Sequence, residues 1–127
     1  MDTKRMALYL GRTRAGLGVA MMIAPRLTLR PWMGPGIDGP VPVAAARMVG
    51  GRDFVLGAGA AIAIGEGHGG ASWVSMGAVA DGVDALVALA SPGLPWRARI
   101  LAVLAGGSAV AHFLLARELG KEETARL

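Results

Sequence analysis

Seven ionisable residues lie within long apolar segments of this 127-residue chain, and they are the residues most able to do chemistry. A charge at the centre of a bilayer costs about 2.5–3.5 kcal/mol on insertion scales, so unpaired charges there are rare. Four of the seven are basic and three are acidic, which predicts pairing inside the protein. The seven are Arg12, Arg14, Arg47, Arg52, Asp53, Asp81 and Asp84.

Two of the carboxylates, Asp81 and Asp84, are three residues apart, which places both on one face of a helix. Paired carboxylates can carry a proton or act as general acid and base. If the chain is an enzyme, Asp81 and Asp84 are the catalytic acid and base and Arg52 gives electrophilic support. Such a site could open an epoxide or isomerise a hydrophobic substrate. The alternative is a buried salt-bridge network that fixes how the helices pack.

We expect the three aspartates to meet at mid-depth, with Arg12 and Arg52 as their basic partners. Arg14 lies about 200° around a helix from Arg12, so one of the two should extend to the lipid headgroups. His112 is interpreted either as a hydrogen-bonded packing residue or as a ligand or proton relay. The predicted polar network consists of Arg12, Arg47, Arg52, Asp53, Asp81, Asp84 and His112.

The composition is that of a membrane protein. Hydrophobic residues make up 54% of the chain, aromatic residues 5% and charged residues 17%, whereas soluble domains carry about 25% charge. Intrinsic disorder is excluded because disordered chains are poor in apolar residues. We therefore expect one integral membrane domain over residues 1–127, crossing the cell (inner) membrane several times.

Several functional classes are excluded or disfavoured. The chain has no cysteine, which excludes disulfides, thiolate metal sites and cysteine nucleophiles. Only His68 and His112 could supply imidazole ligands, so we expect no metal and no cofactor. The net charge of +4 comes from scattered basic residues without the aromatic pattern of RNA-binding domains, so no nucleic-acid partner is expected.

Four apolar segments are each close to the roughly 20 residues that a membrane-spanning helix needs. Short connections make the neighbouring helices antiparallel, and the sequence predicts an all-α, four-helix transmembrane bundle. Prolines and glycines between residues 26 and 42 predict a loop that covers one end of the bundle. The predicted spans are residues 6–24, 43–64, 73–90 and 96–116.

Small residues form a stripe along each predicted helix, which allows helix backbones to approach closely in lipid. Arg12, Gly16 and Ala20 fall four apart in the first segment, and Asp53 and Gly57 begin a similar series in the second. A polar group therefore lies on each predicted contact face.

Two motifs carry a family resemblance. The run from Ala46 to Gly57 (ARMVGGRDFVLG) and the pattern Trp73-x3-Gly77-x3-Asp81-x2-Asp84 resemble small actinobacterial four-helix membrane proteins of unknown function. These are similar in size and organisation to DoxX-like membrane proteins, which are described as membrane partners of oxidoreductase systems. The resemblance implies a four-helix fold and an accessory role, and it supplies no catalytic residues.

The sequence favours a small module in the lipid bilayer that binds a lipophilic molecule or a membrane partner. That partner could be another protein or a second copy of the chain. The alternative is the intramembrane acid–base enzyme described above. A proton-coupled transporter is less favoured, because a chain of 127 residues would have to oligomerise and no span is broken by proline or glycine near the aspartates.

Overall fold

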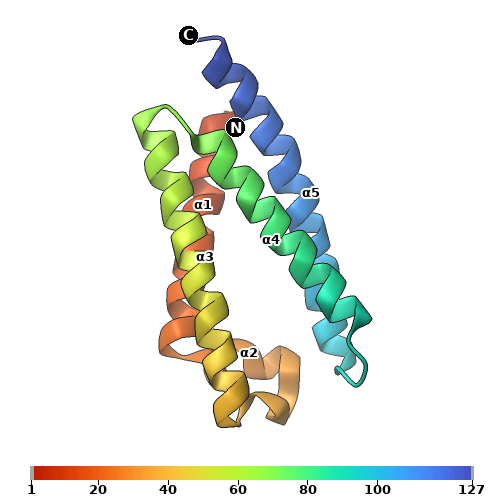
Figure 1. Ribbon diagram of the computed structural model, residues 1–127. Helices are drawn as coiled ribbons and strands as arrows, with labels where there is room; N and C mark the ends of the chain where they lie inside the picture. Colours follow the sequence, from red (N-terminus) through yellow and green to blue (C-terminus); the bar gives the residue numbers. More distant parts are fainter. Residues whose placement is uncertain (1, 127) are drawn as a thin grey trace.

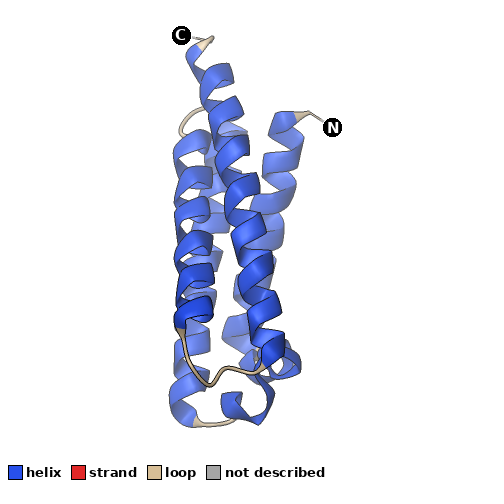
Figure 2. Ribbon diagram, turned by 90° about the vertical axis from the view of Figure 1, so that its right-hand side faces the viewer, coloured by secondary structure: helices blue, strands red, loops and turns tan. Residues whose placement is uncertain are grey.

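The computed structural model describes residues 2–126, and every regular element in that range is a helix. The prediction of an all-α fold is therefore confirmed. The four long helices form an elongated bundle with both termini at one end (Figures 1 and 2). The elements in order are α1 (Thr3–Ile23), α2 (Pro25–Met33), a 3₁₀ turn η1 (Gly34–Ile37), α3 (Pro40–Glu66), α4 (Gly70–Ala90) and α5 (Trp96–Thr124).

The long helices form two pairs. α1 packs along α3 and α4 packs along α5, whereas the two pairs touch each other less extensively (Figure 1). The pairs separate toward the end of the molecule that carries α2, where α3 and α4 diverge. Groups that bridge the two pairs therefore hold the bundle together.

Glycines allow α1 and α3 to approach closely. A Cβ on Gly18 would lie 2.5 Å from the carbonyl oxygen of Gly50, and a Cβ on Gly50 would lie 2.6 Å from that of Gly18. Gly11 and Gly57, each seven residues away on its own helix, make a second contact of this kind. A Cβ at Gly18, Gly50 or Gly57 would clash with the facing backbone, so glycine permits this close approach, as in tightly packed helices in lipid.

The distribution of side chains is the reverse of that in a water-soluble bundle. The core consists largely of alanines and glycines, and within residues 2–126 no large side chain is less than 2% exposed. Large apolar side chains point outward instead, for example Val79 at 67%, Leu86 at 69% and Val103 at 67% exposure. α3, α4 and α5 are long and apolar enough to cross a membrane. α1 has the length but also carries Arg12 and Arg14.

The segment between the first two predicted spans is not the loop that the sequence predicted. Pro25 begins α2 and Pro40 begins α3, at first-turn positions where the missing N–H has no helical partner anyway. Gly34 ends α2 with a φ of 63°. These two prolines therefore start helices, while Pro31 lies inside α2. α2 covers one end of the bundle (Figure 1).

α5 continues past the predicted boundary at residue 116 to Thr124. The extra turns bring Glu123 to the start of α4, where its Oε1 accepts the N–H groups of Gly70 at 2.9 Å and Ala71 at 3.4 Å. These N–H groups have no partner within α4. The charged tail therefore caps a neighbouring helix.

Candidate functional site

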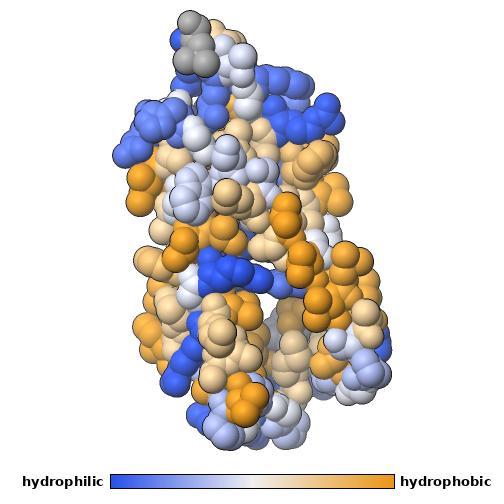
Figure 3. Space-filling model, viewed as in Figure 1, coloured by the Kyte–Doolittle hydropathy of each residue, from blue (hydrophilic) through white to orange (hydrophobic). Residues whose placement is uncertain are grey.

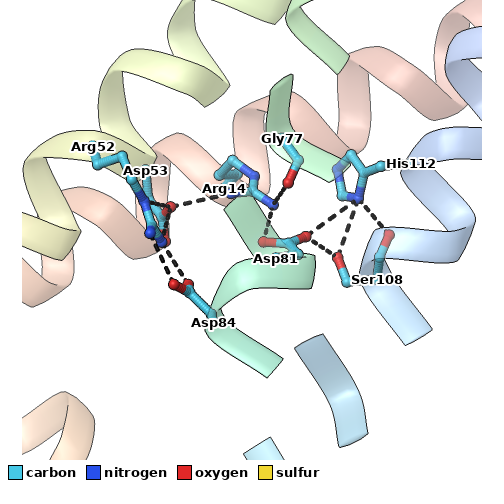
Figure 4. Close-up of polar contacts among 8 residues, drawn as sticks. All are labelled: Arg14, Arg52, Asp53, Gly77, Asp81, Asp84, Ser108 and His112. Carbon is cyan, nitrogen blue, oxygen red and sulfur yellow. Dashed lines mark hydrogen bonds and ion pairs between the residues drawn. The ribbon is translucent and has the colours of Figure 1, made fainter. Parts of the chain in front are cut away.

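A continuous chain of ion pairs and hydrogen bonds links the four long helices near their middles (Figure 4). Each helix contributes at least one polar side chain from a face that is otherwise small or apolar. We call this set the charge network. Its members, in order of contact, are Asp84, Arg52, Asp53, Arg14, Asp81, Ser108 and His112.

Arg14 is the central member. Its Nη1 donates to Asp53 Oδ1 at 3.1 Å, its Nη2 forms an ion pair with Asp81, and Nη2 also donates to the carbonyl oxygen of Gly77 at 3.5 Å. Only 10% of the Arg14 side chain is exposed. One guanidinium from α1 thus joins α3 to α4, and it packs against Gly77, where a Cβ would lie 3.7 Å from it.

Arg52 and Asp84 form the open end of the charge network. Arg52 Nη1 donates to Asp84 Oδ1 at 2.9 Å and Nη2 donates to Oδ2 at 2.6 Å, the parallel arrangement in which guanidinium and carboxylate pair best. Arg52 Nη2 also donates to Asp53 Oδ1 at 3.1 Å. The two side chains are 34% and 38% exposed. A hydrophilic band crosses the largely apolar middle of the face in Figure 3.

Asp81, Ser108 and His112 form the closed end. Ser108 Oγ donates to Asp81 Oδ2 at 2.6 Å, and His112 Nδ1 lies 3.6 Å from the same oxygen. Nδ1 is also 2.9 Å from the carbonyl oxygen of Ser108, which can only accept, so this nitrogen carries a hydrogen. The His112 and Asp81 side chains are 10% and 11% exposed.

The formal charges of the network do not cancel. Two arginines and three aspartates leave a charge of −1 when His112 is neutral. A proton on His112 would bring the sum to zero. His112 is the remaining ionisable side chain of the network, and its Nδ1 lies 3.6 Å from Asp81 Oδ2.

The space beside the network is small. A cavity of about 10 Å³ lies next to Arg14, Gly77 and His112, with Trp73 on its wall. That volume accommodates about one water molecule. The cavity is too small for an organic substrate, and no aspartate of the network lines it. Arg14 pairs with Asp81, and Arg52 pairs with both carboxylate oxygens of Asp84.

The structure brings together five of the seven residues predicted for the network. Arg52, Asp53, Asp81, Asp84 and His112 are members as expected.

Arg12 and Arg47 lie outside the network, contrary to the sequence-based expectation. Arg12 is exposed on α1, and Arg14 occupies the place predicted for it. The side chain of Arg47 is exposed as well, and its Nε donates to the carbonyl oxygen of Met22 at 3.1 Å. Ser108 is a member that the sequence-based network lacks, although it lies one helical turn before His112 and bonds to it.

No three metal-ligating side chains gather anywhere in the part of the chain that the structure describes. Comparison of the chain with protein-family models, curated proteins and solved structures finds no match. The resemblance to DoxX-like proteins stays a prediction from the sequence, and the function has to be argued from the geometry.

Proposed function

We propose that this chain is a four-span protein of the cell (inner) membrane that forms one domain and binds a lipophilic molecule beside Arg52 and Asp84. The outward-facing apolar side chains and the three membrane-capable helices support the membrane placement. α1 is the fourth proposed span, because it is 21 residues long, packs along α3 through glycines and buries Arg14 in the network.

The partial exposure of the Arg52–Asp84 pair is the observation that carries the ligand proposal. About a third of each side chain is open, although the surrounding surface is apolar, with Val55 at 55% and Val83 at 50% exposure. Ionisable groups in membrane spans normally face a partner or a wet cavity. A lipophilic molecule with a hydroxyl or carbonyl group would cover the apolar surface and hydrogen-bond to the pair.

A membrane protein partner or a second copy of the chain is the competing occupant. A helix with one polar side chain could cover the same pair, in line with the accessory role that the resemblance implies. The enzyme alternative, with Asp81 and Asp84 as catalytic groups and Arg52 as support, is less well supported because both aspartates are held by arginines.

The proton-coupled transporter is the second candidate, and the contact between Asp81 and His112 is the observation that favours it. Liposomes that contain the wild type or the Asp81→Asn variant test it by proton uptake. Transport by the wild type that is lost in the variant would support it, and equal uptake in both would contradict it.

Mass spectrometry of extracted small molecules tests the ligand proposal. Wild type, Arg52→Gln and Arg12→Gln are purified with their surrounding lipid and extracted with organic solvent. Arg12 is a matched control because it is an exposed arginine outside the network. We expect a lipophilic compound with wild type and Arg12→Gln, and at least severalfold less with Arg52→Gln.

Equal amounts of every compound in all three extracts would contradict the ligand proposal. A protein that copurifies with wild type and Arg12→Gln but not with Arg52→Gln would identify a partner as the occupant instead.

A further inference from the structure

The end of the molecule that carries α2 is strongly basic. It holds five arginines and one acidic residue, a net charge of +4 that equals the net charge of the whole chain. At the opposite end, five basic residues (Lys4, Arg5, Arg117, Lys121 and Arg126) are balanced by five acidic ones (Asp2, Glu66, Glu118, Glu122 and Glu123). We define the α2 end by Arg26, Arg30, Asp38, Arg47, Arg97 and Arg99.

Three of these arginines each donate one hydrogen bond to a backbone carbonyl. Arg47 Nε donates to Met22 at 3.1 Å, Arg97 Nη1 to Pro31 at 3.4 Å and Arg99 Nη1 to Leu89 at 3.1 Å. Each acceptor is in the last turn of a helix, where carbonyls lack helical partners. A guanidinium has five N–H donors, so most donors of each side chain stay available to an anion.

Arg26 and Arg30 on α2 share one weak acidic partner. Their nitrogens lie 4.0 Å and 3.4 Å from the two carboxylate oxygens of Asp38, and their side chains are 55% and 62% exposed. A single carboxylate neutralises only one of the two. The second positive charge faces outward, on a short helix that lies across the end of the bundle (Figure 1).

Apolar side chains lie among the arginines. Leu27 is 80% exposed on α2, Ile23 is 75% exposed at the end of α1, and Trp96 is 68% exposed at the start of α5. The Arg97 guanidinium lies 5.7 Å from the Trp96 ring centre. Basic residues mixed with exposed leucine and tryptophan are typical of helices that lie at the headgroup level of a membrane.

We propose that the α2 end is a docking surface for the phosphate headgroups of anionic lipids. The proposal rests on the membrane placement proposed above but not on a ligand beside Arg52. Charge complementarity identifies the occupant, because phosphate accepts several guanidinium hydrogens at once. The arginines are spread over a surface with exposed leucine and tryptophan, which suits acyl chains below the headgroups better than a free phosphate.

Native mass spectrometry of the purified full-length protein tests this surface. Detergent-solubilised protein is mixed with phosphatidylglycerol or phosphatidylcholine, and the lipid adducts are counted. The Arg26→Gln/Arg30→Gln double variant is compared with Lys4→Gln/Arg5→Gln at the opposite end. Arg26→Lys/Arg30→Lys retains the charge and controls for loss of α2 packing.

Wild type should bind phosphatidylglycerol in preference to phosphatidylcholine. Each basic residue near an anionic surface strengthens binding about fivefold, so the Arg26→Gln/Arg30→Gln variant should bind at least about tenfold more weakly. The Lys4→Gln/Arg5→Gln and Arg52→Gln variants should bind like wild type. The Arg26→Lys/Arg30→Lys variant keeps the charge and should bind more tightly than Arg26→Gln/Arg30→Gln. The Arg52→Gln result separates this surface from the site of the proposed function.

Equal binding of the two lipids by wild type would overturn the proposal. So would a loss of phosphatidylglycerol binding in Lys4→Gln/Arg5→Gln as large as that in Arg26→Gln/Arg30→Gln. Competition by millimolar inorganic phosphate would also overturn it, because the surface would then recognise a soluble phosphate rather than a lipid.

Discussion

Arg14 on α1 and Asp81 on α4 form an ion pair across the boundary between the two helix pairs. The same guanidinium donates to Asp53 on α3 at 3.1 Å, so one side chain holds three of the four long helices. Both members are nearly buried, with 10% and 11% of their side chains exposed. This contact therefore fixes how helices α4 and α5 pack against helices α1 and α3.

The Arg14→Gln substitution should strongly destabilise the fold. It leaves Asp53 and Asp81 without their shared cation, and breaking a buried pair costs about 3–5 kcal/mol. The free energy of unfolding can be measured by titrating the protein in mixed micelles with SDS. The matched control is Arg12→Gln, two residues away and exposed, which should change stability by less than about 0.5 kcal/mol. Equal effects of the two substitutions would contradict this role of Arg14.

The choice between Arg12 and Arg14 could have been made from the sequence. The buried residues of α1 alternate in steps of four and three: Ala7, Gly11, Arg14, Gly18 and Met21. The predicted stripe from Arg12 through Gly16 to Ala20 used steps of four only, which drift around a helix of 3.6 residues per turn. A Cβ on Gly16 meets no atom within 4 Å. The alternating pattern keeps Arg14 on the contact face.

Other features of the fold could be predicted only in part. The long helices follow from apolar segments of adequate length, and Asp81 and Asp84 share a face because they are three residues apart. The pairing of α1 with α3 depends on which glycines meet across two helices, which no local pattern specifies. The cap that Glu123 provides for Gly70 likewise joins residues 53 positions apart.

Glycine crossings between α1 and α3 give the second prediction. Gly50→Ala adds a Cβ 2.6 Å from the Gly18 carbonyl oxygen and 2.9 Å from Met21 Cβ, so the helices must separate. Overpacking of this kind costs about 1–3 kcal/mol. Gly16→Ala is the control, since its Cβ meets open space and alanine favours helix. Thermal unfolding in detergent should show a lower melting temperature for Gly50→Ala only. A Gly50→Ala variant as stable as wild type would show that the crossing is looser than described.

The pair of Arg52 and Asp84 should show energetic coupling. Arg52→Gln leaves Asp84 without its cation, and Asp84→Asn leaves Arg52 with Asp53 as its acidic partner, whereas the double substitution removes both charges of the pair. The coupling energy of contacting residues is about 0.5–3 kcal/mol, and a value near 1 kcal/mol is expected because both side chains are a third exposed. A double-mutant cycle of unfolding free energies measures it. Strictly additive effects would show that the two side chains do not pair in the folded protein.

The carboxylate of Glu123 should stabilise the start of α4. Its Oε1 accepts two N–H groups that have no partner within the helix, and loss of a helix cap costs about 1 kcal/mol. Glu123→Ala should lower the free energy of unfolding by that amount. Glu122→Ala, one residue earlier, removes the same charge without the cap and should have little effect. Similar losses in both variants would assign the effect to charge alone.

Cysteine labelling tests whether α1 crosses the membrane together with α3, α4 and α5. The chain has no cysteine, so Arg5→Cys, Gly36→Cys and Lys121→Cys can each be introduced singly and treated in intact cells with a membrane-impermeant maleimide. Four spans place residues 5 and 121 on one side and residue 36 on the other. Three spans, with α1 outside the bilayer, would place residues 5 and 36 on the same side, opposite residue 121.

The same labelling tests the orientation. If the α2 end docks on the anionic cytoplasmic leaflet, Gly36→Cys should be protected and the two terminal cysteines labelled. The opposite labelling pattern would keep the four spans but place the α2 end at the outer leaflet, against the proposed lipid surface.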